Sequence, residues 1–283
     1  MYNLESSRLR LAVHGPEDGF YQGTRFDRGG VLDSLQWDGK EICGRWFERY
    51  SPLMHDAVCG PAEEFTAIGY RPGGLFLKIG VGLLRADDAP YDRFHLYEVE
   101  NPGEWTVAQT DSSLVFCHRL KDWYEYRKTL ALTGESRFEI RHELHAFQAL
   151  EGQVYNHNFF TLGRMEVGPE RLLDFPFTPS GTWRASYDSV AFEGMGIRFS
   201  RRLEPGESVF SGDIHQCGKE GMPYSLRLRD RDISVQISGN VPVTHTVLWA
   251  NHRIACLEPY NRFSATPGHP FAWSVQYEIF KTR

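Results

Sequence analysis

Two segments that lie far apart in the chain carry side chains suited to proton transfer. His157 lies in YNHNFF at 155–160, and Glu258 lies in CLEP at 256–259. Both segments are otherwise largely apolar and typical of β-strands. An imidazole beside a carboxylate can donate a proton at one end of a small molecule while the carboxylate accepts one at the other. The pair indicates general acid–base chemistry that needs no metal or cofactor.

Each of these residues also has a simple structural explanation. His157 could be a core histidine hydrogen-bonded to a neighbour. Glu258 could be an exposed residue at the sheet rim, because Pro259 has no N–H and is expected to end the pairing of its strand. If Glu258 is partly buried, its pKa should rise toward the range of a general base. The flanking amides of Asn156 and Asn158 are expected to hold the histidine tautomer and to bind hydroxyls, since buried amides need partners.

Other reactive side chains receive less support. Glu63 and Glu64 are adjacent, so they point to opposite faces of an extended segment and cannot together form a glycosidase pair. His142 and His145 would also lie on opposite strand faces, which makes them a weak metal site. The signatures of serine hydrolases, zinc proteases and phosphate-binding loops are absent from the sequence.

The composition is that of a mildly acidic globular protein. The chain has 283 residues and a formal net charge of −6, which argues against nucleic-acid and membrane-surface partners. No apolar run approaches the roughly 20 residues that span a bilayer, and the N-terminus lacks a signal-peptide pattern. The five cysteines are odd in number and widely spaced, which argues against a disulfide framework or a zinc site. We therefore expect a cytoplasmic protein with free thiols, either a monomer or a homodimer.

Period-two alternation of apolar and polar residues dominates the chain, and helical periodicity is nearly absent. Residues 137–144 alternate cleanly, as a strand with one wet face would. Residues 224–229 and 233–237 predict one hairpin, and residues 114–117 with 124–132 predict another pair.

No linker, repeat or change of composition divides the chain. The sequence therefore predicts a single all-β domain over residues 1–283, with two large sheets packed face to face. Residues 48–104 are the least regular part, and loops on a rigid β scaffold often carry ligand contacts. Aromatic residues make up 14% of the chain, which suits a β-rich core as well as a sugar-binding cleft.

Three segments together resemble a known enzyme family. YNHNFFTL at 155–162 resembles the N-H-S-Y-F-N-L signature of the aldose 1-epimerases, the galactose mutarotases. ACLE at 255–258 resembles the strand that carries the catalytic glutamate of that family. Residues 267–280 resemble its last hairpin, a Pro-Gly turn that leads into a Tyr-x-Phe strand. The similarity is specific over about residues 140–280 and diffuse before them, as in a divergent branch.

The resemblance implies a single-domain β-supersandwich of the galactose mutarotase-like type, with a shallow open cleft for a monosaccharide and no cofactor. Carried over by position, His157 would be the general acid and Glu258 the general base. Glu258 would take the proton of the anomeric hydroxyl while His157 protonates the ring oxygen. The open aldehyde would then turn about its C1–C2 bond and close as the other anomer.

The sugar-binding residues of the family are not matched. Its arginine in N-R-I and its second histidine in L-H-G-G have no counterpart here. Lys78, Arg71, His55 and His95 are the expected replacements, with Lys78 and His95 first by position. Asp213 is the candidate for binding ring hydroxyls.

Asn156 and Glu64 complete the set of expected substrate contacts. If Arg71 and Lys78 line the cleft, the substrate could be an anionic sugar, whether phosphorylated, sulfonated or uronic.

Two other functions are compatible with the sequence. One is a carbohydrate-binding homologue without turnover on the same fold. The other is a lyase or hydrolase on a related sandwich, which would show either an Arg/Tyr/His cluster or two carboxylates about 5–9 Å apart. Glu258 would then pair with Glu63, Glu64 or Asp213.

Overall fold

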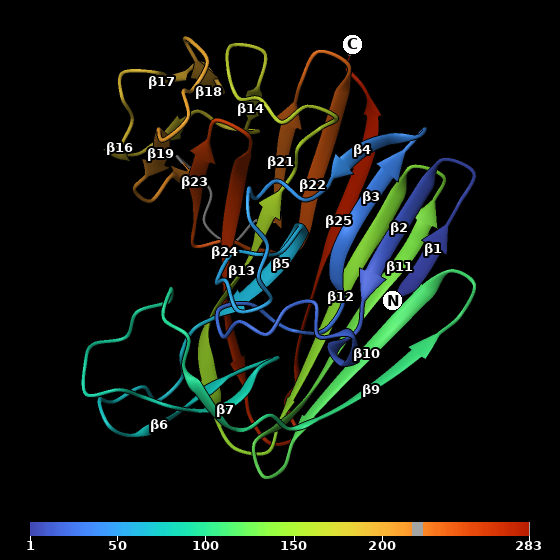
Figure 1. The fold of residues 1–283 in the computed structure, drawn as a ribbon, viewed down its shortest axis with the longest axis vertical. Coiled ribbons are helices and arrows are strands. Elements are labelled where there is room, and N and C mark those ends of the chain that lie inside the picture. The colour runs from blue at the N-terminus through green and yellow to red at the C-terminus, as the bar shows by residue number, and fades with distance from the viewer. Residues whose placement is uncertain (217–222, 283) are drawn as a thin grey trace.

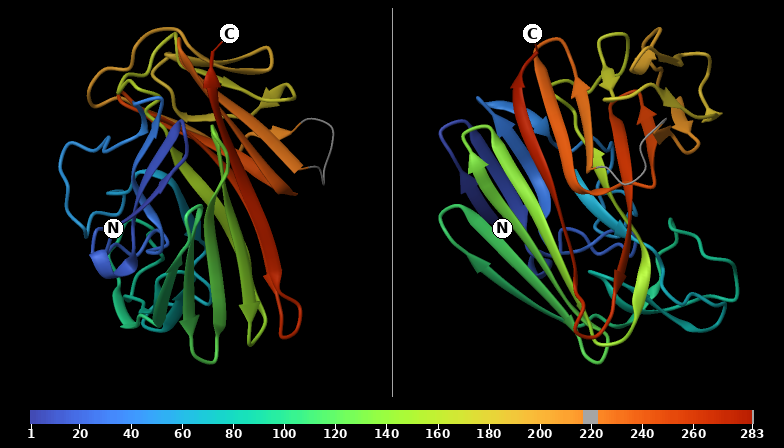
Figure 2. Two further views of the ribbon diagram at one scale, coloured as in Figure 1. Left: turned by 90° about the vertical axis from the view of Figure 1, so that its right-hand side faces the viewer. Right: turned by 180° about the vertical axis from the view of Figure 1, so that it is seen from behind.

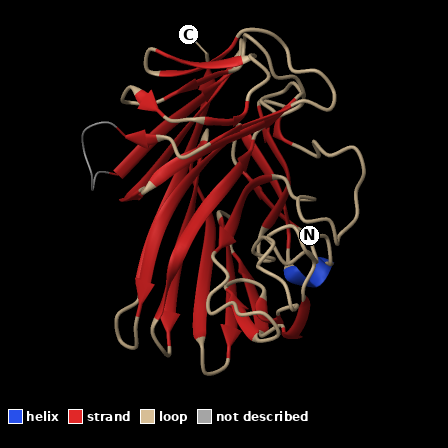
Figure 3. Cartoon of the chain, turned by 90° about the vertical axis from the view of Figure 1, so that its left-hand side faces the viewer, coloured by secondary structure: helices blue, strands red, loops and turns tan. Residues whose placement is uncertain are grey.

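The computed structural model describes residues 1–216 and 223–282, and nearly all of their regular structure is β (Figure 1). Among these residues the only helix is the short 3-10 turn η1 (Pro16–Asp18), which stands out in Figure 3 against the strands. The described strands form five sheets, and each strand pairing is antiparallel, as in the hairpin-rich pattern of the sequence.

The largest sheet has ten strands, which are, in order across the sheet, β17 (Val190–Glu193), β18 (Gly196–Phe199), β14 (Leu172–Asp174), β21 (Pro223–Arg229), β22 (Ile233–Pro242), β25 (Phe271–Lys281), β12 (Arg137–Ala146), β11 (Tyr124–Gly134), β10 (Ser113–Leu120) and β9 (Glu104–Gln109). The second sheet has six, which are β16 (Trp183–Ala185), β19 (Ser208–Ser211), β23 (His245–Asn251), β24 (Ala255–Ala265), β13 (Leu150–Phe159) and β5 (Gly60–Phe65).

Three smaller sheets complete the fold. The N-terminal sheet contains β1 (Tyr2–Glu5), β2 (Leu9–His14), β3 (Val31–Trp37) and β4 (Lys40–Cys43). A three-stranded sheet contains β6 (Leu75–Lys78), β7 (Gly82–Arg85) and β8 (Glu98–Asn101), and a two-stranded sheet contains β15 (Pro179–Ser180) and β20 (His215–Gln216).

The predicted strands are present where the alternation is clearest. β10 pairs with β11, and β21 pairs with β22, so both predicted pairs are confirmed. The cleanly alternating residues 137–144 lie in β12, which buries every second side chain. β25 does the same, and the strands β10, β11, β12 and β25 lie side by side in the ten-stranded sheet (Figure 2). The predicted all-β fold class is confirmed.

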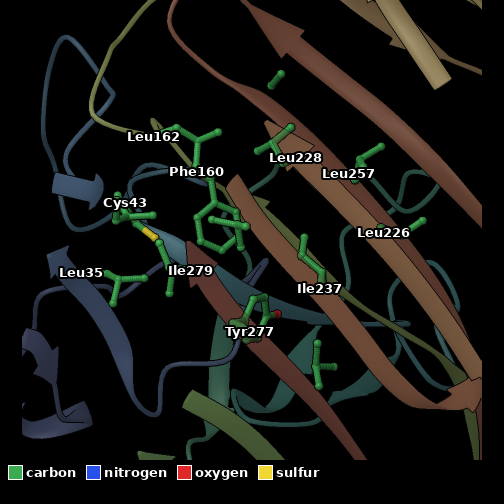
Figure 4. Packing of buried hydrophobic residues seen from close by; sticks show 14 of the residues in the cluster. Leu35, Cys43, Phe160, Leu162, Leu226, Leu228, Ile237, Leu257, Tyr277 and Ile279 are labelled. Atoms are coloured by element: carbon green, nitrogen blue, oxygen red, sulfur yellow. The ribbon is translucent and has the colours of Figure 1, made fainter. Parts of the chain in front are cut away.

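One large hydrophobic cluster joins the sheets. It contains side chains from both ends of the chain, from Leu4 in β1 to Ile279 in β25. Figure 4 shows part of this cluster, in which Tyr277 and Ile279 of β25 lie near Phe160 and near Cys43 of β4. Full burial of one such aliphatic or aromatic side chain contributes roughly 1.5–3 kcal/mol. The ten-stranded sheet therefore serves as the common base on which the six-stranded and N-terminal sheets pack.

The three-stranded sheet lies beside one end of the six-stranded sheet (Figure 1). Leu77 and Ile79 belong there to one hydrophobic cluster with Val154 of β13 and Phe263 of β24. This position brings the irregular segment between β7 and β8 close to the outer face of β13 and β24.

A buried charged group connects the two large sheets. Lys128 of β11 makes an ion pair with Glu63 of β5, and its Nζ lies 3.5 Å from Asp27 Oδ2. Asn156 Nδ2 donates to Glu63 Oε1 at 2.9 Å, and the Tyr126 hydroxyl donates to Asp27 Oδ2 at 3.3 Å. Burial raises the pKa of Asp27 to about 6, although Lys128 opposes the shift. The ammonium group of Lys128 thus provides the buried positive charge for the carboxylates of both Glu63 and Asp27.

No helix in residues 1–216 and 223–282 has the length and apolar character needed to cross a membrane. Four cysteines in this part of the chain are free thiols, namely Cys43, Cys59, Cys117 and Cys256. Cys217 lies outside the described residues.

Replacing Lys128 should strongly destabilise the fold. Lys128→Ala leaves the carboxylates of Glu63 and Asp27 buried without their cation, and breaking a buried pair in this way costs about 3–5 kcal/mol. Urea denaturation measures the change in the free energy of unfolding. The exposed Lys121 provides the control, since Lys121→Ala should change this free energy by less than about 0.5 kcal/mol. A loss below 1 kcal/mol for Lys128→Ala would contradict the expectation.

Candidate active site

The pairing of β13 with β24 brings His157 and Glu258 together. The ladder between the two strands ends at Tyr155 and Tyr260, and the next residue of β24 is Pro259, which has no N–H to continue it. β24 nevertheless continues, because Pro259 and Glu258 still pair with β23. Pro259 therefore ends only one of the two ladders. Glu258 is buried, so of the two alternatives for this residue the exposed rim position is excluded.

His157 and Glu258 contact each other directly. His157 Nε2 lies 3.2 Å from Glu258 Oε1, and the two side chains are only 3% and 4% exposed. His157 Nδ1 has no hydrogen-bond partner among residues 1–216 and 223–282. The structure thus places the two predicted proton-transfer groups side by side in a buried position.

Burial shifts both groups toward their neutral forms. It raises the pKa of Glu258 to about 7, although the positive charges of Arg25 and Arg93 oppose this shift. Burial also lowers the pKa of His157 well below its ordinary value, and Arg25 and Arg93 lower it further. Near neutral pH the imidazole is therefore uncharged, and the carboxyl group is poised to hold or release a proton.

A second carboxylate lies on the same face of the sheet. Glu64 of β5 pairs with Tyr155 of β13, and paired residues of adjacent strands share one face. Arg25 Nε donates to Glu64 Oε2 at 2.6 Å, and Arg25 Nη2 donates to the Tyr155 hydroxyl at 3.1 Å. Burial would raise the pKa of Glu64, but Arg25, Lys78 and Arg93 together hold it below its ordinary value. Glu64 is thus a charged member of the site.

Two tyrosines connect this carboxylate with the proton-transfer pair. The rings of Tyr155 and Tyr260 stack with their centroids 4.2 Å apart. The Tyr155 hydroxyl donates to Glu64, and the Tyr260 hydroxyl donates to Glu258 Oε2 at 3.4 Å. Glu64 and Glu258 therefore lie at two ends of one tyrosine platform.

Arg93 reaches the site from the segment between β7 and β8. Its Nε lies 3.5 Å from Glu64 Oε1, and its Nη1 donates to the Tyr155 hydroxyl at 3.2 Å. Sequence reasoning missed Arg25, Arg93 and Tyr260. Arg25 and Arg93 come from loops without a regular pattern, so no local signal relates them to strands far along the chain.

Aromatic side chains surround the imidazole. The ring of His157 stacks on Phe159 at 3.8 Å between centroids, and Phe26 and Trp249 approach it edge-on. Phe26 belongs to a buried cluster that also contains Trp46 and other side chains of the N-terminal loops. The resemblance implies a shallow open cleft at the pair, and this expectation is not met, because these loops pack over the outer face of β13.

A pocket of about 280 Å³ opens beside the covered pair. It is lined by Glu64, Phe65, Thr66, Ala67, Tyr70, Tyr91, Arg93, Gln153, Tyr155 and Tyr260. Aromatic walls with a few charged groups are typical of small-ligand sites. Since Tyr260 also contacts Glu258, the pocket and the pair adjoin.

Of the predicted binding residues, Glu64 lines this pocket, and Lys78 contacts two residues of its wall. Lys78 is buried and donates to the Phe65 carbonyl at 2.7 Å and to the Tyr91 hydroxyl at 3.3 Å. Burial lowers the pKa of Lys78 to about 8, while Glu64 opposes the shift. His55 lies with its ring centroid 4.7 Å from that of Phe94, and its charge, when present, lowers the pKa of His157.

Three other predicted residues are not brought to the pair. His95 makes an exposed ion pair with Asp87, and Arg71 lies in an exposed turn before β6. Asp213 is partly exposed, and its Oδ1 lies 3.8 Å from His245 Nε2.

Asn156 contacts Glu63 on the inner face of β13, because successive side chains of a strand alternate between faces. Asn158 also points inward and donates to the Leu257 carbonyl at 2.7 Å. Neither amide therefore holds the tautomer of His157.

No group of three or more His, Cys, Asp or Glu within the described ranges is arranged to hold a metal ion. His142 is buried and His145 is exposed, so the two lie on opposite faces of β12 as predicted.

Neither a model of a protein family nor a curated protein sequence matches this chain. Solved structures match it over its whole length. The GalM/aldose epimerase homologue from C. elegans has a TM-score of 0.62 and 13% identity, and covers 100% of this chain and 99% of its own. A putative aldose 1-epimerase from Escherichia coli has a TM-score of 0.57 and 14% identity, with 99% of each chain covered.

The chain has the galactose mutarotase fold. The Slr1438 protein from Synechocystis also matches the chain, with a TM-score of 0.61, 16% identity, and coverage of 99% of this chain and 96% of its own. The resemblance noted in the sequence is therefore confirmed at the level of the fold. A galactose mutarotase fold at such low identity fits a divergent branch.

The Glu258 carboxyl should titrate at about pH 7. Its folded-state pKa is raised from 4.5, so the folded protein keeps a proton that the unfolded chain releases between about pH 4.5 and 7. The protonated Glu258 carboxyl therefore stabilises the folded protein at low pH, and this stabilisation is lost as the pH rises through that window. Carboxyl-selective 13C NMR measures the titration, and the signal should vanish in Glu258→Gln. A titration near pH 4.5 would contradict the structure.

Proposed function

We propose that this protein is an isomerase that interconverts the α and β anomers of an aldose. The contact between His157 Nε2 and Glu258 Oε1 at 3.2 Å carries the proposal. Ring opening of a sugar hemiacetal exchanges protons at two oxygens attached to the same carbon. Acid and base must therefore lie side by side, as these two groups do. The mutarotase fold and the adjoining pocket of about 280 Å³ support the same conclusion.

The pair needs one transferable proton in addition to the N–H of neutral imidazole. The raised pKa of Glu258 lets the pair keep this proton up to about pH 7, and movement of the proton to His157 produces an imidazolium beside a carboxylate. Glu258 then accepts the proton of the anomeric hydroxyl as the bond between C1 and the ring oxygen breaks. His157 delivers its proton to that ring oxygen.

The reverse transfers close the ring. After rotation about the C1–C2 bond, the hydroxyl that was the ring oxygen attacks the other face of the aldehyde. It returns its proton to His157, while Glu258 protonates the new anomeric oxygen. The two residues end in their starting states, so no cofactor is consumed.

One observation favours a second candidate function. The pair is almost fully covered, which is unusual for groups that must exchange protons with a bound sugar. A carbohydrate-binding homologue without turnover would tolerate this burial. Binding of a sugar without enzyme-dependent exchange of its anomers would support this second function and refute the first.

Removing either proton-transfer group should abolish most of the exchange. His157→Asn and Glu258→Gln should each lower the exchange rate by about 10²- to 10⁴-fold, the range for one general acid or base. The double variant should lose little more, because the two groups act as a unit. Two-dimensional exchange NMR on glucose and galactose measures the rate.

An exposed His–Glu pair provides the matched control. His145 Nε2 lies 2.9 Å from Glu143 Oε1 at the surface of β12. His145→Asn and Glu143→Gln should leave the rate within about two-fold, in line with the small effects of surface substitutions. If His157→Asn stays equally active, His157 is not the acid.

The dependence of kcat/KM on pH should report the loss of the proton that His157 and Glu258 share. Because the pair loses it as Glu258 ionises at about pH 7, kcat/KM should be constant below that pH and fall tenfold per unit above it. Initial rates of anomer exchange between pH 5 and 9, corrected for the spontaneous reaction, measure this profile. A rise through pH 7 would show that the ionised carboxylate alone is the active form.

A further inference from the structure

Arg93 lies between the outer pocket and the covered pair. Its side chain is 39% exposed and lines the pocket, while its guanidinium contacts Glu64 and Tyr155. Glu64 does not depend on this contact, because Arg25 already donates to it at 2.6 Å. One carboxylate therefore has two guanidinium partners, and the outer one faces the pocket.

The charges around the pocket do not balance. Three cations, Arg25, Arg93 and Lys78, surround the ionised carboxylate of Glu64. Glu258 adds little negative charge below about pH 7, because burial keeps it protonated. Positive charge in excess of its partners is unfavourable in a partly buried site. An arriving anion would restore the balance.

The other charged groups near the pair do not cancel this excess. The negative charges of Asp56 and Asp92 lie near His55, whose pKa is lowered by burial and raised by these two charges. Asp92 is itself exposed to solvent. Tyr91, Tyr155 and Tyr260 stay uncharged near neutral pH, because burial raises the pKa of each above its ordinary value.

On the basis of the proposed function, we propose that the substrate is an anionic aldose and that Arg93 binds its carboxylate or phosphate group. A guanidinium binds either group through charge-assisted hydrogen bonds, often two at once. The pocket of about 280 Å³ suits one sugar ring. The Arg93 guanidinium lies over the Tyr155 ring at 6.0 Å, so its movement toward an anion would free that ring for stacking on the sugar.

Binding of the anion would also prepare the proton-transfer pair. Arg93 lowers the pKa of both His157 and Glu258 through its positive charge, acting together with the larger effect of Arg25. An anion on Arg93 cancels that charge, so both pKa values rise. The pair then keeps its transferable proton to a higher pH. A neutral sugar has no such effect.

The test compares neutral and anionic sugars in variants of Arg93. We measure kcat/KM for anomer exchange by NMR with glucose, glucose 6-phosphate and glucuronate. Wild-type protein should prefer at least one anionic sugar over glucose by more than tenfold, and the better of the two identifies phosphate or carboxylate. Arg93→Gln should lose roughly 10- to 100-fold on that sugar, the effect of a hydrogen bond to a charged group, and stay within about threefold on glucose at pH 6, where the pair keeps its proton in both proteins.

Two further variants separate charge from structure. Arg93→Lys keeps the charge and should retain more activity on the anionic sugar than Arg93→Gln. Arg85 of β7 is 49% exposed and ion-paired with Glu100, so Arg85→Gln should behave as wild type. In Arg93→Gln the high-pH limb of kcat/KM on glucose should also move upward, a change that a structural role for Arg93 would not produce.

The outcomes distinguish this inference from the proposed function. Equal exchange of glucose and both anionic sugars by the wild type, or equal losses on all three in Arg93→Gln, would overturn the role of Arg93. Exchange of no sugar would refute the isomerase. In that case calorimetric titration decides the matter: binding of an anionic sugar that is lost in Arg93→Gln supports Arg93 as its ligand, and equal binding by both proteins rejects it.

Discussion

The register of β5, β13 and β24 is the constraint on which the site depends. It places Glu64 and Tyr155 on the outer face, together with His157 and Glu258. The same register turns Glu63 and Asn156 inward, where Lys128 neutralises the buried carboxylate. A shift of one residue would exchange the two sets, because strand side chains alternate with period two. The inner ionic group and the outer site are therefore two results of one alignment.

Burial gives the outer face its chemical character. Removed from water, a carboxylate and an imidazole both favour their neutral forms, so one proton can pass between them near neutral pH. Glu64 is as buried as Glu258 but remains charged, since Arg25 lies against it. Two glutamates on one sheet face thus differ in protonation because only one has a guanidinium in direct contact.

The cover over this face differs from the open cleft that the family resemblance implies. Aromatic side chains of the N-terminal loops, among them Phe26 and Trp46, pack around His157 and Phe159. On the side of the face that borders the pocket, the cover is the loop that carries Arg93. The strands that carry the proposed acid and base resemble the family signature in sequence, whereas the sugar-binding motifs of that family have no match in this chain. The proposed reaction and the proposed substrate class accordingly rest on different parts of the chain.

The sequence by itself determined the positions of many strands and singled out His157 and Glu258. Period-two alternation located β10, β11, β12, β21 and β22, and His157 and Glu258 stood out as polar residues in apolar strands. It also determined that Glu63 and Glu64 face opposite ways, since alternation is a local property. Only the tertiary structure decided that Arg25 and Arg93 join the site, that Asn156 faces inward and that Arg71 and His95 lie away from the pair. Long-range packing and strand register decide such contacts, and residues in irregular loops carry no local pattern that reveals their partners.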